Sequence, residues 1–401
     1  MNTLSLKDGV TYIGVQDHYL RVFDIIMYTE FGTSYNSYLV QGSEKTAIIE
    51  TVKLKFIDEY IKKIKSLTDL DKIDYIVVNH TEPDHVGSIE KLLKLMPNVT
   101  IVGSAPALKF LKNIVNTEFK SILTVLVDQI DLGGKTLKFI PAPFLHWPDS
   151  IYTYLEEDKI LFSCDSFGAH YAHDPVLLST VKNLDDYNKA LRYYFDMIFG
   201  PFKQHMLNAI DKIENLDIDI IATGHGPILD ENPMDTVATC KEWSTETNPN
   251  SKKTIIVPYV SAYGYTRAMA EEIKRTIESE YSKDLDINIF DMVEESKEDV
   301  LDRIYWADGI LFGSPTINSD ALPPIWDILI SLNPIVHGKK YASAFGSYGW
   351  SGEAVKNIEA RLKQLRFKVI PGLKIEFKPN QDDLSKVTEF AREFATDLLA
   401  K

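Results

Sequence analysis

Short apolar runs separated by polar turns dominate residues 1–250. Runs of this length predict strands, and longer stretches with one apolar face predict helices. A tight polar turn at Glu157-Asp158, between two β-rich runs, predicts a hairpin. We predict strands at Tyr38–Val40, Thr46–Glu50, Tyr75–Val78, Thr100–Val102, Leu137–Ile140, Ile151–Glu156, Lys159–Cys164 and Ile218–Thr223. We predict helices at Phe56–Ser66, Ile89–Leu95, Ala107–Asn113, Leu184–Ile198 and Lys203–Asn215.

The pattern of apolar and polar positions changes after the polar, proline-containing stretch Thr245–Lys253. From there, strands that are apolar throughout alternate with helices, which predicts a parallel sheet covered on both faces. We predict strands at Ile255–Val260, Ile287–Phe290, Gly309–Phe312, Tyr341–Phe345 and Leu373–Phe377. The predicted helices are Thr266–Ser279, Lys297–Tyr305, Pro324–Leu332, Glu353–Leu365 and Leu384–Leu399. The sequence therefore predicts two domains, residues 1–250 and 251–401, the second a doubly wound five-stranded α/β fold.

Composition excludes several classes of protein. The chain has 401 residues and a formal net charge of −15, which argues against nucleic-acid binding because that depends on clustered Lys and Arg. Lysines do cluster between Lys53 and Lys72, but their spacing predicts the solvated face of an amphipathic helix. No apolar run is long enough to cross a bilayer, and the N-terminus has no secretory signal. We expect no membrane association and a cytoplasmic location.

The chain has only two cysteines, Cys164 and Cys240, and they lie far apart in the sequence. This excludes a disulfide framework, a cysteine-rich zinc site and a cysteine-bound iron–sulfur cluster. Cys164 ends an apolar run, which predicts a small buried side chain rather than a reactive thiol. Any metal in this protein must therefore be held by histidines and carboxylates.

Candidate metal ligands follow the predicted strands of the first half. The segment Asn79–His85 directly follows one strand and carries His80, Glu82, Asp84 and His85, and Pro83 disfavours a helix there. Three more candidates, each just past an apolar strand, are His146, Asp165 and His225. Any one of them alone could be a core histidine or a turn aspartate. Seven such residues in this order predict a site for a pair of metals.

The ligand pattern resembles the metallo-β-lactamase superfamily, whose αββα sandwich binds two metals. The family uses a His-x-His-x-Asp-His loop followed by a later His, Asp and His. This chain departs from the pattern at Glu82, where the family has a histidine. A hard, anionic carboxylate shifts the preference of a site from zinc towards iron.

Three loops in the second half predict a flavin site. The first opens the helix after the first strand, where backbone N–H groups suit a phosphate, and consists of Ser261, Ala262, Tyr263, Gly264, Tyr265 and Thr266. The sequence has neither the lysine of a P-loop nor a G-x-G-x-x-G, so a monophosphate fits best. The other loops follow the third and fourth strands: Ser314, Pro315, Thr316, Ile317 and Asn318, then Ser347, Tyr348, Gly349, Trp350, Ser351 and Gly352.

All three loops lie at the carboxyl ends of parallel strands, so they should meet at one crevice. Trp350 and Tyr348 offer aromatic faces to a flat isoalloxazine ring. This arrangement is similar to that of flavodoxins and predicts FMN. Tyr265 departs from it, because flavodoxin phosphate loops more often carry Asn or Ser at that position.

Glu82, together with the flavodoxin-like half, makes the whole chain similar to the flavodiiron protein family. The resemblance implies FMN and two non-haem irons, one held by His80, Glu82 and His146, the other by Asp84, His85 and His225, with Asp165 bridging. Family members differ in whether the histidine matching His85 binds iron. His170 is expected over the metals, as a proton donor or as a hydrogen-bond partner of the ligands. One of Tyr193 and Tyr194 is expected to line the substrate pocket.

The resemblance implies an oxidoreductase that reduces dioxygen to water, nitric oxide to nitrous oxide, or both. Two ferrous ions and a reduced flavin together hold the four electrons that dioxygen requires. Electrons would come from an external donor, a rubredoxin or a reduced deazaflavin, and the working unit would be a head-to-tail homodimer or a dimer of dimers. The alternative is a zinc hydrolase of the metallo-β-lactamase type with an accessory flavin module, in which a metal-bound hydroxide attacks an ester or phosphodiester.

Overall fold

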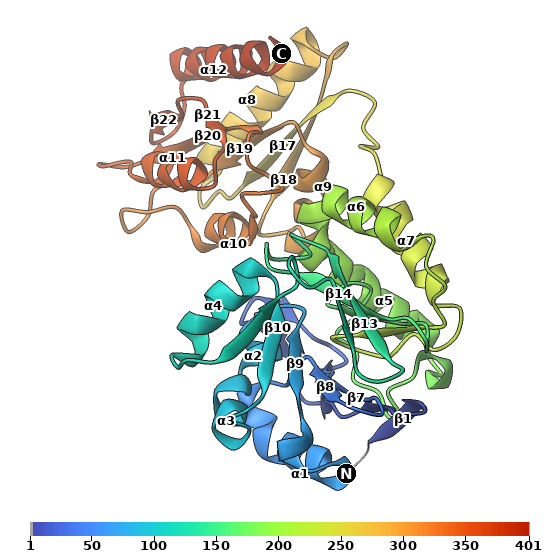
Figure 1. Ribbon diagram of the computed structural model, residues 1–401. Coiled ribbons are helices and arrows are strands. Elements are labelled where there is room, and N and C mark those ends of the chain that lie inside the picture. The colour runs from blue at the N-terminus through green and yellow to red at the C-terminus, as the bar shows by residue number, and fades with distance from the viewer. Residues whose placement is uncertain (1–2, 401) are drawn as a thin grey trace. The chain divides into compact units, whose positions relative to one another are not determined.

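The computed structural model describes residues 3–400 and divides into two compact units, Met1–Glu246 and Thr247–Lys401 (Figure 1). The division falls in the polar stretch where the hydrophobic rhythm changes. Among the described residues, no helix combines the length and apolar character that crossing a bilayer requires.

Two facing sheets form the centre of the first unit. One has the order β1-β2-β7-β8-β9-β10-β11, with strands Leu4–Lys7, Val10–Tyr12, Tyr38–Gln41, Thr46–Ile49, Tyr75–Val78, Thr100–Gly103 and Lys120–Leu123. The other runs in order from β12 to β16, with strands Gln129–Asp131, Thr136–Pro141, Ile151–Leu155, Ile160–Cys164 and Ile220–Thr223. Two short ribbons pair β3 with β6 and β4 with β5, at Val15–Asp17, Thr33–Tyr35, Val22–Phe23 and Met27–Tyr28.

Strands β8 and β9 are apolar throughout because both of their faces are buried. Ala47, Ile49 and Val77 belong to the core between the two sheets, together with residues of the second sheet. Ile48 and Ile76 point the other way, into the core shared with the helices. Alternate residues of one strand thus serve two cores, as the two-residue period of a strand requires. Helices on the outer faces complete the predicted αββα sandwich, which is confirmed (Figure 1).

The helices of the first unit largely match the predicted ones. They are α1 Ile57–Leu67, α2 Pro83–Val86, α3 Ile89–Leu95, α4 Ala105–Val115, α5 Leu184–Tyr194, α6 Lys203–Ile213 and α7 Pro233–Thr245. Helix α5 runs into a π-helical segment at Phe195–Phe199, and short 3₁₀ segments lie at Leu54–Phe56, Leu70–Lys72, Leu178–Thr180 and Gly200–Phe202. Helix α7 was not predicted from the sequence.

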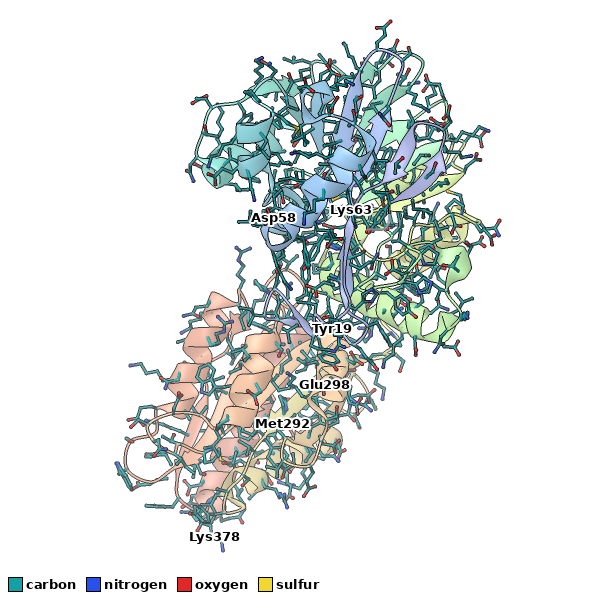
Figure 2. All side chains as sticks on the ribbon, turned by 90° about the horizontal axis from the view of Figure 1, so that it is seen from below. Tyr19, Asp58, Lys63, Met292, Glu298 and Lys378 are labelled. Carbon is teal, nitrogen blue, oxygen red and sulfur yellow. The ribbon has the colours of Figure 1, made fainter. Side chains whose placement is uncertain are left out.

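One lysine of α1 departs from the predicted solvated face. Lys63 is 4% exposed, donates to the carbonyl of Gly14 at 2.6 Å and pairs with Glu59 at 3.0 Å (Figure 2). The expectation that the lysine cluster lies in solvent is therefore wrong for Lys63. Its long aliphatic stem packs into the unit, while a carbonyl and a carboxylate take the place of water at the ammonium.

The second unit is a doubly wound parallel sheet, as predicted. Its order is β18-β17-β19-β20-β21, and β22 also pairs with β20. The strands are β17 Lys253–Tyr259, β18 Leu285–Asp291, β19 Gly309–Gly313, β20 Tyr341–Tyr348, β21 Lys368–Val369 and β22 Leu373–Glu376. The helices are α8 Tyr265–Glu280, α9 Lys297–Trp306, α10 Pro323–Ser331, α11 Ala354–Gln364 and α12 Gln381–Leu399. The predicted fifth strand is thus two segments, β21 and β22, which pair with successive parts of β20.

Two separate cores cover the faces of this sheet. Residues of α9, α10 and α11 pack on one face, and residues of α8 and α12 pack on the other. Helix α12 begins with a capping box. The Asn380 side chain accepts the Asp383 N–H, and the Asp383 carboxylate accepts the Asn380 N–H. With both faces covered, the carboxyl ends of β17, β19 and β20 are left to carry loops.

Candidate metal centre and flavin loops

The structure brings the seven predicted ligands together beside strand ends of both sheets. The segment after β9 carries His80 and Glu82 and leads directly into α2. Pro83 was expected to keep this segment non-helical, which is wrong. Pro83 is the first residue of α2, where a proline loses no hydrogen bond, and Asp84 and His85 follow it in the single helical turn.

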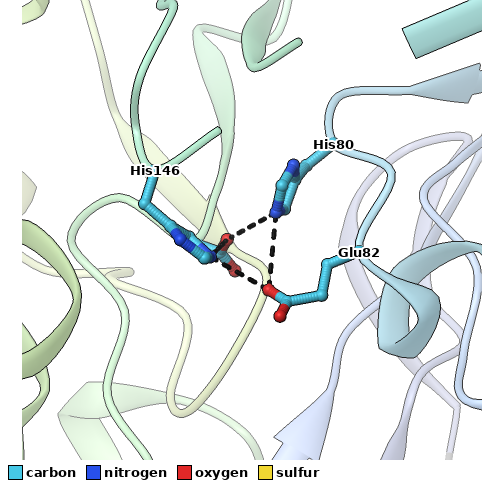
Figure 3. A group of neighbouring side chains, drawn as sticks. His80, Glu82 and His146 are labelled. Carbon is cyan, nitrogen blue, oxygen red and sulfur yellow. Dashed lines mark hydrogen bonds and ion pairs between the residues drawn. The ribbon is translucent and has the colours of Figure 1, made fainter. Parts of the chain in front are cut away.

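The first cluster consists of His80, Glu82, His146 and Asp165 (Figure 3). Oε2 of Glu82 lies 2.9 Å from Nε2 of His146 and 3.5 Å from Nε2 of His80. Oδ2 of Asp165 lies 3.6 Å from the same nitrogen of His80 and 3.7 Å from that of His146. Two imidazoles and two carboxylates therefore converge on one point, which is a donor set suited to iron.

The second cluster consists of Asp84, His85 and His225. Oδ2 of Asp84 lies 3.1 Å from Nε2 of His225 and 3.7 Å from Nε2 of His85. The other oxygen of Asp165, Oδ1, lies 2.9 Å from His85 and 3.4 Å from His225. Asp165 thus turns one oxygen to each cluster, which is the geometry of a carboxylate bridge between two cations.

The ligand atoms fit a metal pair because they are buried without partners. Among the described residues, six buried ligand atoms have no hydrogen-bond partner. They are Nε2 of His80, Nε2 of His85, both oxygens of Asp84 and both oxygens of Asp165. Buried polar atoms left in this state are costly, so native chains rarely contain them unless an ion or water completes the site. Metal cations at the two clusters would satisfy all six atoms.

The buried negative charges of the two clusters also favour the binding of cations. Burial alone would lower the pKa of His80, but the neighbouring carboxylates of Asp149 and Glu82 raise that pKa to about 10. Burial would raise the pKa of Asp165, yet His85 holds it well below its usual range. Without metal, the carboxylates are therefore balanced by protons on imidazoles. Metal ions take the place of such protons when they bind.

Three groups outside the predicted set hold the ligand histidines from behind. Nδ1 of His80 lies 3.2 Å from the carboxylate of Asp149, and Nδ1 of His85 lies 3.2 Å from that of Glu50. Nδ1 of His225 lies 2.6 Å from the backbone carbonyl of Ser34. Sequence reasoning missed Asp149 and Glu50, although a charged residue beside a ligand or at the end of an apolar strand was a signal for each.

His170 and Tyr194 lie against the second cluster. The His170 ring is 5.2 Å from the His225 ring, and its Nδ1 lies 2.8 Å from the Thr33 hydroxyl. Burial, reinforced by His225, holds the pKa of His170 well below its usual range, so the ring is neutral. The buried Tyr194 meets His170 edge-on at 4.8 Å between ring centroids, whereas the neighbouring Tyr193 is 39% exposed.

The predicted flavin loops lie together at the carboxyl ends of three strands. The Thr266 hydroxyl is 3.1 Å from the Ser347 hydroxyl, which ties the first loop to the third. The Thr316 N–H donates to the Ser347 carbonyl at 2.9 Å, which ties the second loop to the third. Ser314 is buried beneath this point, where its hydroxyl accepts the Leu322 N–H.

The first loop presents the N-terminus of α8 to a ligand. Gly264 adopts a left-handed φ of +80° just before the helix, and no atom lies within 4 Å of where its Cβ would be. A 16-residue helix adds the partial positive charge of its dipole at this end, which suits a phosphate.

Two aromatic side chains of these loops are left in solvent: Trp350 is 94% exposed and Tyr263 is 81% exposed. Large aromatic side chains exposed to this degree are expected to stack on a ligand or a partner. The residues present therefore fit FMN: the N-terminus of α8 would suit its phosphate, and the exposed aromatic side chains would suit its flat ring. The remaining predicted loop residues, Ala262, Tyr265, Pro315, Ile317, Asn318, Tyr348, Gly349, Ser351 and Gly352, lie in the same three loops.

Comparisons with known proteins match the two units separately and together. The family model "ODP family beta lactamase" matches residues 33–226, and the model "Flavodoxin" matches residues 257–390. The flavo-diiron protein FprA2 of Clostridium acetobutylicum is 41% identical over 99% of this chain and 100% of its own length. The anaerobic nitric oxide reductase flavorubredoxin of Escherichia coli is 34% identical over 98% of this chain and 82% of its own length.

Among solved structures, rubredoxin:oxygen oxidoreductase from Desulfovibrio gigas aligns with a TM-score of 0.72 and 26% identity, covering 100% of this chain and 99% of that one. The likeness therefore extends over both units and not over one domain alone. With two metal clusters in the first unit and flavin loops in the second, this chain belongs to the flavodiiron protein family.

Proposed function

We propose that this protein reduces dioxygen, nitric oxide or both at a pair of non-haem irons, with FMN as the electron relay. The observation that carries the proposal is the position of Asp165, whose two oxygens face two separate clusters of buried ligand atoms. The names of the relatives, a nitric oxide reductase and an oxygen oxidoreductase, support both gases as substrates.

Each residue of the centre has a proposed task. His80, Glu82 and His146 hold one iron, Asp84, His85 and His225 hold the other, and Asp165 bridges them. When bound, the irons supply one electron each and the flavin two more, which matches the demand of dioxygen.

The surroundings of the clusters favour this chemistry. His80, Asp84, His85, Asp165 and His225 are all buried, so water is largely excluded from the reacting space. Exclusion of water strengthens every electrostatic interaction within the site. The neutral ring of His170, fixed by Thr33, and the hydroxyl-bearing Tyr194 are proposed to line the pocket for the diatomic gas.

We propose a head-to-tail homodimer, alone or doubled, in which FMN of one chain faces the irons of the other. Phe23 of the β4–β5 hairpin packs against the ring of His170 at 4.3 Å. The tip of the same hairpin exposes Ile25 at 92% and Ile26 at 76%. Apolar tips next to the metal centre, and the exposed Trp350 beside the flavin loops, suit a contact between copies.

The electron donor is proposed to be a separate rubredoxin or a reduced deazaflavin, and the location the cytoplasm. The test is to purify the protein without oxygen, measure iron and FMN per chain, and follow consumption of each gas with each donor. We expect about two irons and one FMN per chain and turnover of at least one gas. A fully loaded protein that reduces neither gas would contradict the proposed function.

A further inference from the structure

A buried carboxylate outside the seven proposed ligands lies behind His80. Asp149 is completely buried, and its Oδ2 lies 3.2 Å from Nδ1 of His80. The backbone N–H and the hydroxyl of Thr81 both donate to this oxygen at 2.7 Å. The Asp149 carbonyl accepts the hydroxyl of Ser104, at the start of α4. Asp149 thus joins the loop of His146 to the loop of His80 and is fixed on several sides.

A second buried carboxylate lies in the same way behind His85. Oε2 of Glu50, whose side chain is 2% exposed, is 3.2 Å from Nδ1 of His85 and 3.6 Å from the thiol of Cys164. The other oxygen of Glu50 accepts the N–H of Asn79, which begins the ligand segment. Gly224 also lies close to the ring, because a Cβ there would lie 2.9 Å from Cε1 of His85. The ring is thus in contact with a carboxylate and has little room beside the backbone of Gly224.

We propose that Asp149 and Glu50 are positioning residues, one behind each cluster, which bind no metal and hold down the reduction potential of the iron pair. This inference rests on the proposed function. A carboxylate that accepts Nδ1–H leaves Nε2 free for the metal and makes the imidazole a stronger donor. His225 is the contrast within the site, since its Nδ1 lies against the neutral backbone carbonyl of Ser34.

Charge counting gives the direction of the effect. Glu82, Asp84 and Asp165 carry three negative charges, and Glu50 and Asp149 bring the buried total to five. Two ferrous ions carry four positive charges and two ferric ions carry six. The five negative charges of the buried carboxylates therefore lie midway between the charges of the two iron states. Removing one carboxylate charge leaves four, which balances the ferrous pair and disfavours the ferric one. In a buried site this imbalance is poorly screened by water and salt.

The variants Asp149→Asn and Glu50→Gln remove each charge while keeping the shape of the side chain. The holoprotein of each is titrated electrochemically, with the iron pair followed by EPR and the flavin by visible absorption. We expect each variant to favour the ferrous form about tenfold, an upward shift of about 59 mV for a one-electron couple. The flavin potential, which belongs to the other unit, should not change. The iron content of each variant is measured as well, and we expect the affinity of the variant protein for iron to fall about 10- to 100-fold.

Two control variants separate charge from structure. Asp158→Asn makes the same change at a partly buried carboxylate that pairs with Lys135, and it should leave both potentials unchanged. Glu50→Asp keeps the charge but shortens the side chain, and it should hold the potential closer to that of the original protein than Glu50→Gln does. Iron-loaded Asn and Gln variants with an unchanged iron potential would overturn the inference, as would a Glu50→Asp variant that shifts as far as Glu50→Gln.

Metal analysis provides a further check, because Glu50, His85 and Cys164 lie close enough to hold an ion of their own. A third metal per chain that is lost in Cys164→Ser would overturn the statement that Glu50 binds no metal. Gas turnover by the unsubstituted protein is measured separately. Failure of that turnover contradicts the proposed function, whereas unchanged potentials in the variants contradict only the role of Asp149 and Glu50.

Discussion

Glu82 is the residue that we propose sets the metal preference of the site. Its Oε2 contacts both His146 and His80, so it supplies a negative charge where the metallo-β-lactamase pattern has a neutral imidazole. Burial would raise the pKa of Glu82, but the hydrogen bond with His146 and the nearby His80 ring hold it well below its usual range. The side chain is therefore an anion at every working pH and favours a hard cation.

The first prediction concerns this residue. Glu82→His should favour zinc over iron in the purified protein and lower gas turnover by about tenfold or more, while FMN content stays normal. Metals are measured by mass spectrometry and turnover with a gas electrode. Glu90→His is the matched control, since Glu90 is exposed on α3 and pairs with Lys94 on the surface. Unchanged iron content and turnover in Glu82→His would show that this carboxylate does not discriminate between the metals.

The adjacent residues Tyr193 and Tyr194 form a natural matched pair. Burial raises the pKa of Tyr194 well above its usual range, so its hydroxyl stays protonated and can donate a hydrogen bond to a ligand at the proposed site. We predict that Tyr194→Phe lowers kcat at least about tenfold with unchanged iron content, and that Tyr193→Phe has no effect. Steady-state rates of both variants with the same donor check this. Equal effects of the two substitutions would rule out the assignment of Tyr194 to the pocket.

At the scale of elements, the segment after α10 carries the only histidine of residues 251–401, His337. Its Nδ1 lies 3.0 Å from both the backbone nitrogen and the carbonyl oxygen of Asn333, and the residue is 8% exposed. Burial, helped by the charge of Lys340, lowers the pKa of His337 from 6.5 to about 4. Between pH 6.5 and pH 4, His337 is protonated in the unfolded chain but neutral in the folded unit. The free energy of unfolding therefore falls as the pH falls through this range.

The third prediction follows from this shift. The second unit should lose up to about 3 kcal/mol of unfolding free energy between pH 6.5 and pH 4 through His337, and His337→Asn should remove that part of the pH dependence. Urea unfolding of the holoprotein, followed through release of FMN, measures it. His18→Asn, at an exposed pair with Asp174 in the other unit, is the control. An identical pH profile for His337→Asn and the original protein would contradict the assignment.

At the scale of the whole molecule, the proposed exchange of electrons between chains has a direct test. One variant loses iron through His80→Ala and His225→Ala, and a second loses FMN through disruption of Ser261–Thr266. Each should be inactive alone. If FMN of one chain serves the irons of the other, refolded mixtures contain hybrid dimers in which one intact flavin faces one intact iron pair.

The fourth prediction is that such mixtures regain about a quarter of the activity expected for the same amount of original protein. The figure assumes random pairing into dimers, in which about half are hybrids and each hybrid has one of two working sites. Differently tagged chains allow the hybrids to be purified and assayed. Verified hybrids without activity would contradict transfer between chains.

Much of this molecule could be predicted from local patterns. The parallel sheet of the second unit followed from strands such as Ile255–Val260 that are apolar throughout, because only a strand buried on both faces has that pattern. The seven candidate ligands could be recognised because they are histidines and carboxylates that each follow a predicted strand. The two-unit architecture followed from the change of rhythm near Thr245–Lys253.

Other features were decided only when distant segments packed. Spacing could not say which oxygen of Asp165 faces which cluster, nor that Glu50 and Asp149 lie behind His85 and His80, since each pair is far apart in the chain. Local rules also failed at Pro83, which begins a helix rather than preventing one. Periodicity specifies which face of an element is buried, but which side chains meet across the core depends on how the sheets pack. The candidate ligands were therefore recognisable in the sequence, and the family resemblance implied their division into two sets. The orientation of the two Asp165 oxygens and the buried carboxylates behind the histidines required the tertiary structure.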